Sequence, residues 1–200
     1  MTTREFMDHF PVDPDDLRRL HARLEREAQV GGLLDIAYRT VDSAVGPLLL
    51  AATPQGLLRV AFASEGHELV LEDLAQRISP RMLEAPTRLD PVAKQLDEYF
   101  TGGRHTFDIA LDWSLSQGFR RRVLGRLATD ITYGTYASYA KLARLSGSPR
   151  AVRAVGTACA TNPIPIVVPC HRVIRSDGTM GNYRGGPAAK RALLDLEHAQ

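Results

Sequence analysis

Two neighbouring residues could together produce a sulfur nucleophile. Cys170 is followed directly by His171 in the segment IPIVVPCHRVI, residues 164–174, and Pro169 precedes the thiol. A cysteine attacks as its thiolate, and an adjacent imidazole can take the thiol proton. The apolar run before Cys170 favours the opposite interpretation, because burial raises a thiol's pKa and free cysteine is commonly a core residue. Residue type alone therefore favours a structural cysteine.

The relative position of the thiol and the imidazole is left open by the sequence. We expect residues 164–168 to form a strand that holds one wall of a pocket. Consecutive side chains of a regular strand point to opposite faces, so a relay between Cys170 and His171 needs a turn or a bridging water. The segment DGTMGNYRGG, residues 177–186, is rich in Gly and could shape the rest of the pocket.

The cysteine count argues against two classes of protein. Cys159 and Cys170 are the only cysteines, which argues against a disulfide scaffold. They lie 11 residues apart without a histidine pair at ligand spacing, so a zinc site is not expected. We expect no metal and no cofactor. The first thirty residues carry acids throughout and no long apolar stretch, which predicts a cytoplasmic protein without membrane association.

The net charge of +2 conceals a strong asymmetry along the chain. Residues 1–113 hold 12 Lys and Arg against 19 Asp and Glu, a net charge of −7. Residues 114–200 hold 13 against 4, a net charge of +9. The C-terminal part is therefore where a polyanion would bind.

Three parts can be distinguished along the chain. Residues 1–32 are predicted to add a helix that ends at a Gly-Gly pair, with Leu17, Leu20, Leu24 and Ala28 on one stripe. Residues 33–113 combine alternating apolar residues, typical of a small antiparallel sheet, with helices near 68–78 and 91–100. A last strand is expected at 106–113. We place the boundary of the third part, residues 114–200, where the charge changes sign.

The third part is predicted to be mainly helical and to contain a helix-turn-helix. A helix within residues 114–131 is followed by a short helix that ends near Leu145 and a turn at Ser146-Gly147. Ser148 is then expected as the N-cap of a second helix, with Pro149 at its first position. The predicted fold class is α/β of the α+β type, with a small antiparallel-sheet N-terminal domain and a mainly helical C-terminal domain.

The second helix presents two contrasting faces. Val152, Val155, Gly156 and Cys159 recur at helical spacing and predict the buried stripe. The residues of its other face are Arg150, Arg153, Ala154, Thr157 and Ala158. This face has few side chains that read base edges, so it favours recognition of shape and phosphate over sequence. Helix-turn-helix patterns also occur in proteins that never touch DNA, but the basic charge favours DNA.

Four strings carry a resemblance to a known family. SYAKLA, RAVGTACATNPIPIVVPCHRVI, DGTMGNYRGG and LLDLE occur in this order and spacing. Together they resemble the C-terminal domain of the O6-alkylguanine-DNA alkyltransferases, also called methylated-DNA–protein-cysteine methyltransferases. The resemblance covers residues 114–200 almost continuously. Residues 33–113 resemble the family's more variable N-terminal domain only in the type of element.

The resemblance implies stoichiometric DNA repair at Cys170. Its thiolate would attack the alkyl carbon on guanine O6 and keep the group as a thioether, which inactivates the protein. His171 would act through a water as the base, and Glu197 would orient that histidine. Asn162 would tie the second helix to the turn before Cys170 by side-chain hydrogen bonds. Acceptance of O4-alkylthymine and the range of alkyl groups stay open.

The resemblance also implies how the alkylated base is held. Tyr183 would lie against the base or donate to it, and backbone groups of Cys170, Val173 and Arg184 would read the guanine edge. Arg153 would fill the place that the rotated base leaves, and Tyr139 would crowd the phosphate that turns the nucleotide out.

The DNA partner implied by the family is a duplex entered through its minor groove. The small-residue face of the second helix would lie in that groove, which adds Arg150, Ala154 and Thr157 to the expected DNA contacts. We expect a monomer and leave clustering along DNA open. Two other functions are alternatives: a non-catalytic alkylated-base-binding protein, against which Cys170 argues, and a methylation-responsive regulator, which usually needs an additional cysteine-rich or DNA-binding part.

Overall fold

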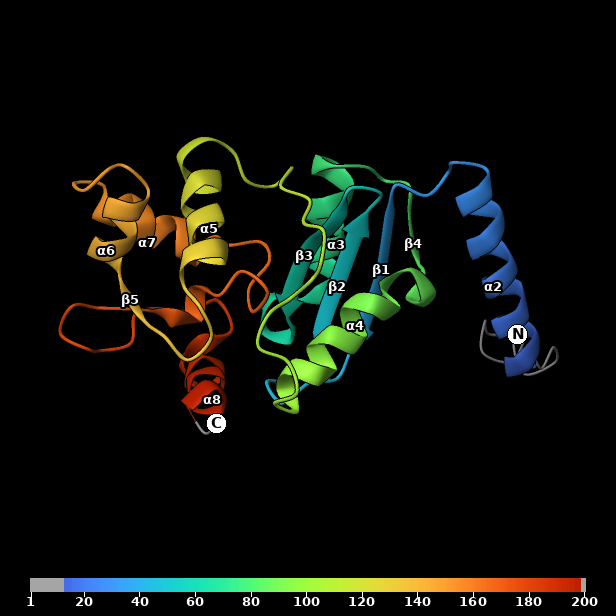
Figure 1. Ribbon diagram of the computed structural model, residues 1–200. Coiled ribbons are helices and arrows are strands. Elements are labelled where there is room, and N and C mark those ends of the chain that lie inside the picture. The colour runs from blue at the N-terminus through green and yellow to red at the C-terminus, as the bar shows by residue number, and fades with distance from the viewer. Residues whose placement is uncertain (1–12, 199–200) are drawn as a thin grey trace, which may run out of the picture.

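The computed structural model describes residues 13–198, which form an N-terminal sheet domain beside a helical C-terminal domain (Figure 1). The sheet has the spatial order β3-β2-β1-β4, and its strands are β1 Ile36–Val41, β2 Leu48–Thr53, β3 Gly56–Phe62 and β4 Met82–Glu84. β1, β2 and β3 pair in the predicted antiparallel manner. The short β4 adds in parallel to β1, so the sheet is mixed at that edge.

Helices cover both faces of this sheet. Successive residues of a strand point to opposite faces. In β2 and its neighbours, Leu48 and Leu50 accordingly join the cluster that includes α4, Pro86–Phe100, whereas Leu49 and Ala51 join the cluster that includes α3, His67–Arg77. Because both faces are covered, every residue of β2 is buried.

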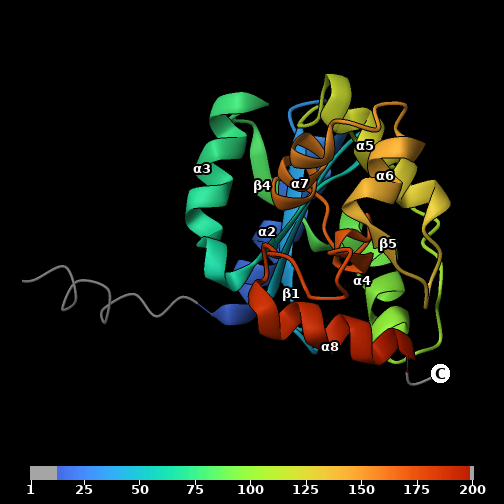
Figure 2. The ribbon, with the colours of Figure 1, turned by 90° about the vertical axis from the view of Figure 1, so that its left-hand side faces the viewer.

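The C-terminal domain is mainly helical, which confirms the predicted fold class. Its elements are α5 Gly118–Asp130, β5 Ala137–Ser138, α6 Tyr139–Leu145, α7 Val152–Ala160, the 3₁₀ turn η2 Cys170–Arg172, β6 Val173–Ile174 and α8 Gly186–His198. β5 and β6 form a small parallel pair. Figure 2 looks onto this domain and shows α8 along one side, with α6 and α7 on the other.

One apolar core runs through both domains. The same cluster contains Val60 and Tyr99 from the sheet domain and Leu124 and Leu193 from the helical domain. Cys170 belongs to this cluster as well. Cys170, the candidate nucleophile, is therefore positioned by side chains of both domains.

The strand predicted at residues 106–113 is wrong. These residues are extended but make only one bridging pair, Leu57 with Leu111. The Leu57 amide donates to the Ala110 carbonyl at 2.8 Å, and the Asp112 amide donates to Leu57 at 2.9 Å. Gly56, with φ of 141°, allows this approach, because a Cβ there would overlap the backbone of Ala110.

The second helix of the helix-turn-helix begins later than predicted. Ala151 is its N-cap, and the Ala151 amide donates to the Ser148 carbonyl at 2.9 Å in the preceding turn. The predicted caps at Ser148 and Pro149 are thus wrong by three residues. Val152 at the first position is 37% exposed, whereas Ala158, which was placed on the open face, is buried.

The added helix α2, Pro14–Val30, lies at the outer end of the sheet domain, far from α6 and α7 (Figure 1). Its predicted stripe mostly faces outward, since Leu17, Leu20 and Leu24 are 53%, 62% and 52% exposed and only Ala28 packs on a buried cluster. The first twelve residues of the predicted 1–32 segment lie outside the described part. No helix within residues 13–198 is long and apolar enough to cross a membrane.

Candidate active site

The apolar run before Cys170 forms a tight turn, so the predicted strand at 164–168 is wrong. The Val168 amide donates to the Ile164 carbonyl at 2.9 Å. Ile166 takes a φ of 74°, a left-handed conformation that is rare for a β-branched residue and that the surrounding packing must hold in place. The turn η2 follows at once, which supplies the bend that a relay between Cys170 and His171 needs.

Asn162 fixes the position of the thiol. Its side-chain amide donates to Cys170 Sγ at 3.1 Å and to the Val168 carbonyl at 2.8 Å, and its Oδ1 accepts from the Ile164 amide at 3.0 Å. The residue is buried just after α7. One side chain thus joins the end of the helix-turn-helix to both sides of the turn before Cys170.

The Cys170 thiol is protonated at rest. Its residue is 3% exposed, and burial raises the pKa of Cys170 to about 11, although the Asn162 hydrogen bond and the charge of Lys190 act to lower it. Burial and the neighbouring Cys170 also raise the pKa of Cys159 far above its usual range. A thiolate at Cys170 must therefore be generated by a base.

His171 and Glu197 form a buried pair beside the thiol. His171 Nε2 lies 2.9 Å from Glu197 Oε1, and neither side chain is exposed. Burial acts to raise the pKa of Glu197, but hydrogen bonds from His171 and Arg172 outweigh it and bring the pKa from 4.5 down to about 2. Burial lowers the pKa of His171. A neutral imidazole beside a carboxylate must donate through Nε2, which leaves Nδ1 as the acceptor.

The unprotonated Nδ1 of His171 is available for proton transfer. This nitrogen is buried and has no hydrogen-bond partner among residues 13–198. No direct hydrogen bond joins it to Cys170 in the described part of the chain, which favours the bridging-water alternative left open by the sequence.

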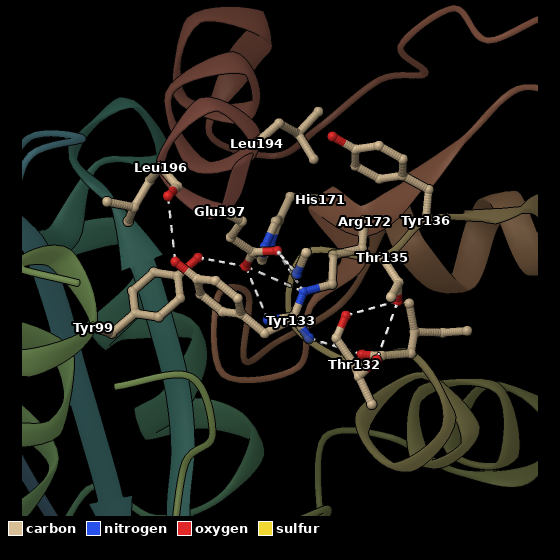
Figure 3. Close-up of polar contacts among 12 residues, drawn as sticks. Tyr99, Thr132, Tyr133, Thr135, Tyr136, His171, Arg172, Leu194, Leu196 and Glu197 are labelled. Carbon is tan, nitrogen blue, oxygen red and sulfur yellow. Dashed lines mark hydrogen bonds and ion pairs between the residues drawn. The ribbon is translucent and has the colours of Figure 1, made fainter. Parts of the chain in front are cut away.

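Arg172 forms an ion pair with Glu197, and the sequence analysis did not identify this residue. Its Nε and Nη2 lie 2.9 Å from Glu197 Oε2 and Oε1 respectively, and its Nη1 donates to the Ile131 carbonyl at 2.8 Å (Figure 3). Arg172 immediately follows His171 in the Pro-Cys-His-Arg string, so its place in the sequence was a signal that it could belong to the site. Its partner is 25 residues away, and no local pattern identifies that pairing.

Tyr183 closes the site from the Gly-rich segment. Its ring lies edge-on to that of His171 at 6.2 Å between centroids and edge-on to Phe62 of β3 at 5.6 Å. The phenol oxygen is buried and has no hydrogen-bond partner within residues 13–198. Burial and the nearby Cys170 raise the pKa of Tyr183, so the phenol is a donor.

All three predicted base-reading positions already make contacts, through backbone groups of Cys170 and Val173 and through the side chain of Arg184. The Val173 carbonyl accepts from Lys190 Nζ at 2.7 Å, a fully buried lysine that the sequence analysis also missed. The Arg184 side chain pairs with Glu65 of the sheet domain at 2.9 Å. The Cys170 amide donates to the Val168 carbonyl at 2.8 Å.

A surface hollow of about 450 Å³ gathers three of the predicted DNA contacts. It is lined by Tyr139 at the start of α6 and by Arg153 and Thr157 of α7, together with Arg175 and Asn182, which the sequence analysis did not single out. The other two predicted contacts do not line this hollow. Arg150 lies exposed in the turn before α7, and Ala154 is exposed on α7.

Neither a disulfide nor a metal group accompanies the site. Cys159 and Cys170 are both free thiols. Within residues 13–198, no three His, Cys, Asp or Glu side chains are grouped so that they could hold a metal ion.

Replacement of Asn162 by alanine should strongly destabilise the protein. The change leaves the buried Ile164 amide without its partner and removes one of the two donors to the Val168 carbonyl, which keeps the Cys170 amide. An unsatisfied buried group costs about 1–3 kcal/mol and a lost hydrogen bond about 1 kcal/mol, so urea unfolding should show a loss of about 2–4 kcal/mol. The exposed Asn182 provides the control, since Asn182→Ala should change the free energy of unfolding by less than about 0.5 kcal/mol. Equal stabilities of the two variants would contradict the anchoring role.

A mixed-sheet domain joined to a helix-turn-helix domain, with a buried thiol beside a His–Glu pair, defines a class of two-domain proteins with a cysteine nucleophile at a DNA-binding fold. Residues 118–199 match the family model described as 6-O-methylguanine DNA methyltransferase, DNA binding domain. Residues 36–113 match the one described as 6-O-methylguanine DNA methyltransferase, ribonuclease-like domain. The chain belongs to this methyltransferase family.

Individual relatives agree with the family assignment. The methylated-DNA–protein-cysteine methyltransferase of Mycobacterium bovis is 42% identical over 82% of this chain and 94% of its own length. The inducible one of Bacillus subtilis is 38% identical over 74% and 82%. A crystal structure of Mycobacterium tuberculosis OGT in complex with DNA aligns with a TM-score of 0.70 at 39% identity, covering 82% of this chain and 93% of that one.

Proposed function

We propose that the protein repairs DNA by moving the alkyl group of O6-alkylguanine directly to Cys170, and that this single transfer inactivates it. One observation carries the proposal: a buried, free Cys170 thiol precedes a histidine that is bonded to an ionised carboxylate, in a domain with a helix-turn-helix. The names of the relatives support the same reaction for this chain. O4-alkylthymine is the alternative lesion that the proposal leaves open.

The transfer is a displacement at the alkyl carbon. His171 Nδ1 takes the proton of Cys170 through a water, and the thiolate attacks the carbon. The new S–C bond forms as the C–O6 bond breaks, and the electron pair of the broken bond stays on guanine O6. The guanine takes up one proton, which balances the proton lost from sulfur. The Tyr183 phenol is placed to donate to the base. The thioether that remains on Cys170 is not cleaved by any base in the site.

Access to the lesion requires that the nucleotide leave the duplex. The O6 atom lies inside the base stack, and rotating a base out costs a few kcal/mol. The exposed small residues of α7 allow close approach in the minor groove, with Ala154 and Thr157 against the backbone and Arg150 near a phosphate. Arg153 fills the vacated place, and Tyr139 at the start of α6 crowds the phosphate.

A duplex with an alkylated guanine is the partner, and the protein acts as a monomer inside the cell, where its DNA substrate lies. A non-catalytic base-binding protein would not need the thiol or the His171–Glu197 pair. A methylation-responsive regulator would usually need a further cysteine-rich or DNA-binding domain in addition to the two that match residues 36–113 and 118–199.

Arg153→Ala should separate base extrusion from chemistry. Without the arginine, the extruded state loses the side chain that occupies the gap, so transfer from duplex DNA should slow by about 10- to 100-fold. Transfer from the free base O6-methylguanine should change by less than about twofold. Single-turnover rates on the two substrates measure this difference.

The matched control removes a positive charge elsewhere in the same domain. Arg191 is an exposed residue of α8, the helix that lies across the domain from α7 in Figure 2, and Arg191→Ala should leave both rates near those of the wild type. An equal loss on the two substrates in Arg153→Ala would argue against the extrusion role.

A further inference from the structure

We propose that Tyr99, a residue of the N-terminal sheet domain, is a positioning residue for alkyl transfer because its phenol holds the Glu197 carboxylate in place for His171. The inference rests on the proposed function. It gives the N-terminal domain a defined part in the chemistry of the C-terminal domain.

The hydrogen bond between the two domains is direct. Tyr99 Oη donates to Glu197 Oε1 at 2.7 Å, and Tyr99 is fully buried near the end of α4. Figure 3 shows the phenol reaching the carboxylate from the side opposite Arg172. His171 Nε2 contacts the same Oε1, so the phenol and the imidazole share one carboxylate oxygen.

Packing against neighbouring aromatic rings fixes the position of the Tyr99 phenol. Its ring packs against Phe100 and Phe107 of the same domain, with centroid separations of 5.4 and 5.3 Å, and against Tyr133 at 6.1 Å. Burial and the adjacent Glu197 raise the pKa of Tyr99, so the group stays protonated and donates. A carboxylate is acceptor-only when ionised, and each additional donor restricts its orientation.

The shared oxygen has a consequence for the base. A donor on the carboxylate withdraws part of the negative charge that would stabilise a protonated imidazole. Removing the phenol should therefore raise the pKa of His171, which leaves less of the neutral base below neutral pH.

Other groups around the pair must be counted in the pH dependence. Those that face Glu197 or His171 are Tyr99 from α4, Tyr133 from the loop after α5, Arg172 from η2, Tyr183 from the Gly-rich segment and Lys190 from α8. The charges of Arg172 and Lys190 both lower the pKa of His171. They are unchanged by a substitution at Tyr99, so a shift in the variant reports the phenol.

The test compares Tyr99→Phe with Tyr133→Phe in the full chain. Each variant removes one hydroxyl group from the same ring cluster and keeps the ring. The Tyr133 hydroxyl, unlike that of Tyr99, donates to the Leu196 carbonyl at 3.3 Å and makes no bond to Glu197. The substrate is a duplex with one O6-methylguanine, and the single-turnover transfer rate is measured across pH. NMR titration of His171 in the free protein gives a second readout that needs no transfer.

Tyr99→Phe should still gain one methyl per protein, but about tenfold more slowly on the acid side of neutrality and by less than about twofold on the alkaline side. Its His171 titration should move to higher pH. Tyr133→Phe should match the wild type in both measurements. A Tyr99→Phe profile and titration like those of the wild type, or the same displacement in both variants, would overturn the inference. Absence of methyl gain in the wild type would contradict the proposed function instead, while the titration would still decide the role of Tyr99.

Discussion

Cys170→Ala should gain no methyl group from DNA that contains O6-methylguanine, and it should still bind that DNA. The variant lacks the sulfur that accepts the Asn162 hydrogen bond and that precedes His171. Alanine keeps the turn and the packing, so the DNA affinity should change by less than about 1 kcal/mol. Mass spectrometry of the intact protein and fluorescence anisotropy with a labelled duplex measure the two properties.

Cys159 supplies the matched control. It is a second buried, free thiol on α7, and its pKa is raised further than that of Cys170. Cys159→Ala should therefore accept one methyl at a rate close to that of the wild type. Methyl gain by Cys170→Ala would show that another residue is the acceptor.

Glu197→Gln should have the largest combined effect on rate and stability. The amide keeps one oxygen but places an NH₂ group among the donors His171 and Arg172 and removes the charge that both require. General base catalysis contributes about 10²–10⁴-fold, and we expect a loss of transfer on the order of 100-fold or more. Breaking a buried ion pair costs about 3–5 kcal/mol, which should appear in urea unfolding.

The stability effect should depend on pH. The pKa of Glu197 is about 2 in the folded protein, against an ordinary value of 4.5. A depressed carboxyl pKa stabilises the fold above the unfolded pKa, and that contribution is lost as the pH falls from about 4.5 toward about 2. Wild-type stability should drop by about 3 kcal/mol over this range from Glu197 alone, on the usual 1.36 kcal/mol per unit.

The control for this prediction lies on the same helix. Asp195 is an exposed acid of α8, and Asp195→Asn should keep the wild-type transfer rate and the wild-type acid unfolding curve. If Glu197→Gln retained the full acid-dependent loss of stability, the titrating group would have to be another carboxyl.

Local patterns in the sequence were sufficient to predict most of the helices and strands. The alternation in β1 to β3 and the Ser146-Gly147 turn predicted the sheet and the helix-turn-helix, because a strand face and a tight turn each depend on nearby residues. The strand at 106–113 failed for the same reason. Its apolar residues do alternate, but a strand also needs a neighbouring strand to pair with, and here the pairing is limited to the bridge between Leu57 and Leu111.

The reactive part was less accessible from the sequence. The run IPIVVP suggested a strand, whereas Asn162 and the left-handed Ile166 turn it back on itself. Tyr99 lies 98 residues from Glu197, and a contact at that separation leaves no periodic signal. Lys190 is an ordinary helix residue by type, and only the folded chain shows that it is buried against the Val173 carbonyl. The family resemblance named the thiol, the imidazole, the carboxylate and Asn162, but not Tyr99, Arg172 or Lys190.

The most direct test of alkyl transfer to Cys170 is the mass of the wild-type protein after one incubation with a duplex that carries a single O6-methylguanine. One methyl should replace one hydrogen per protein molecule, peptide mapping should place it on Cys170, and the guanine in the DNA should be restored in equal amount. Restoration of guanine without any change in protein mass, or a methyl found on Cys159, would contradict transfer to Cys170.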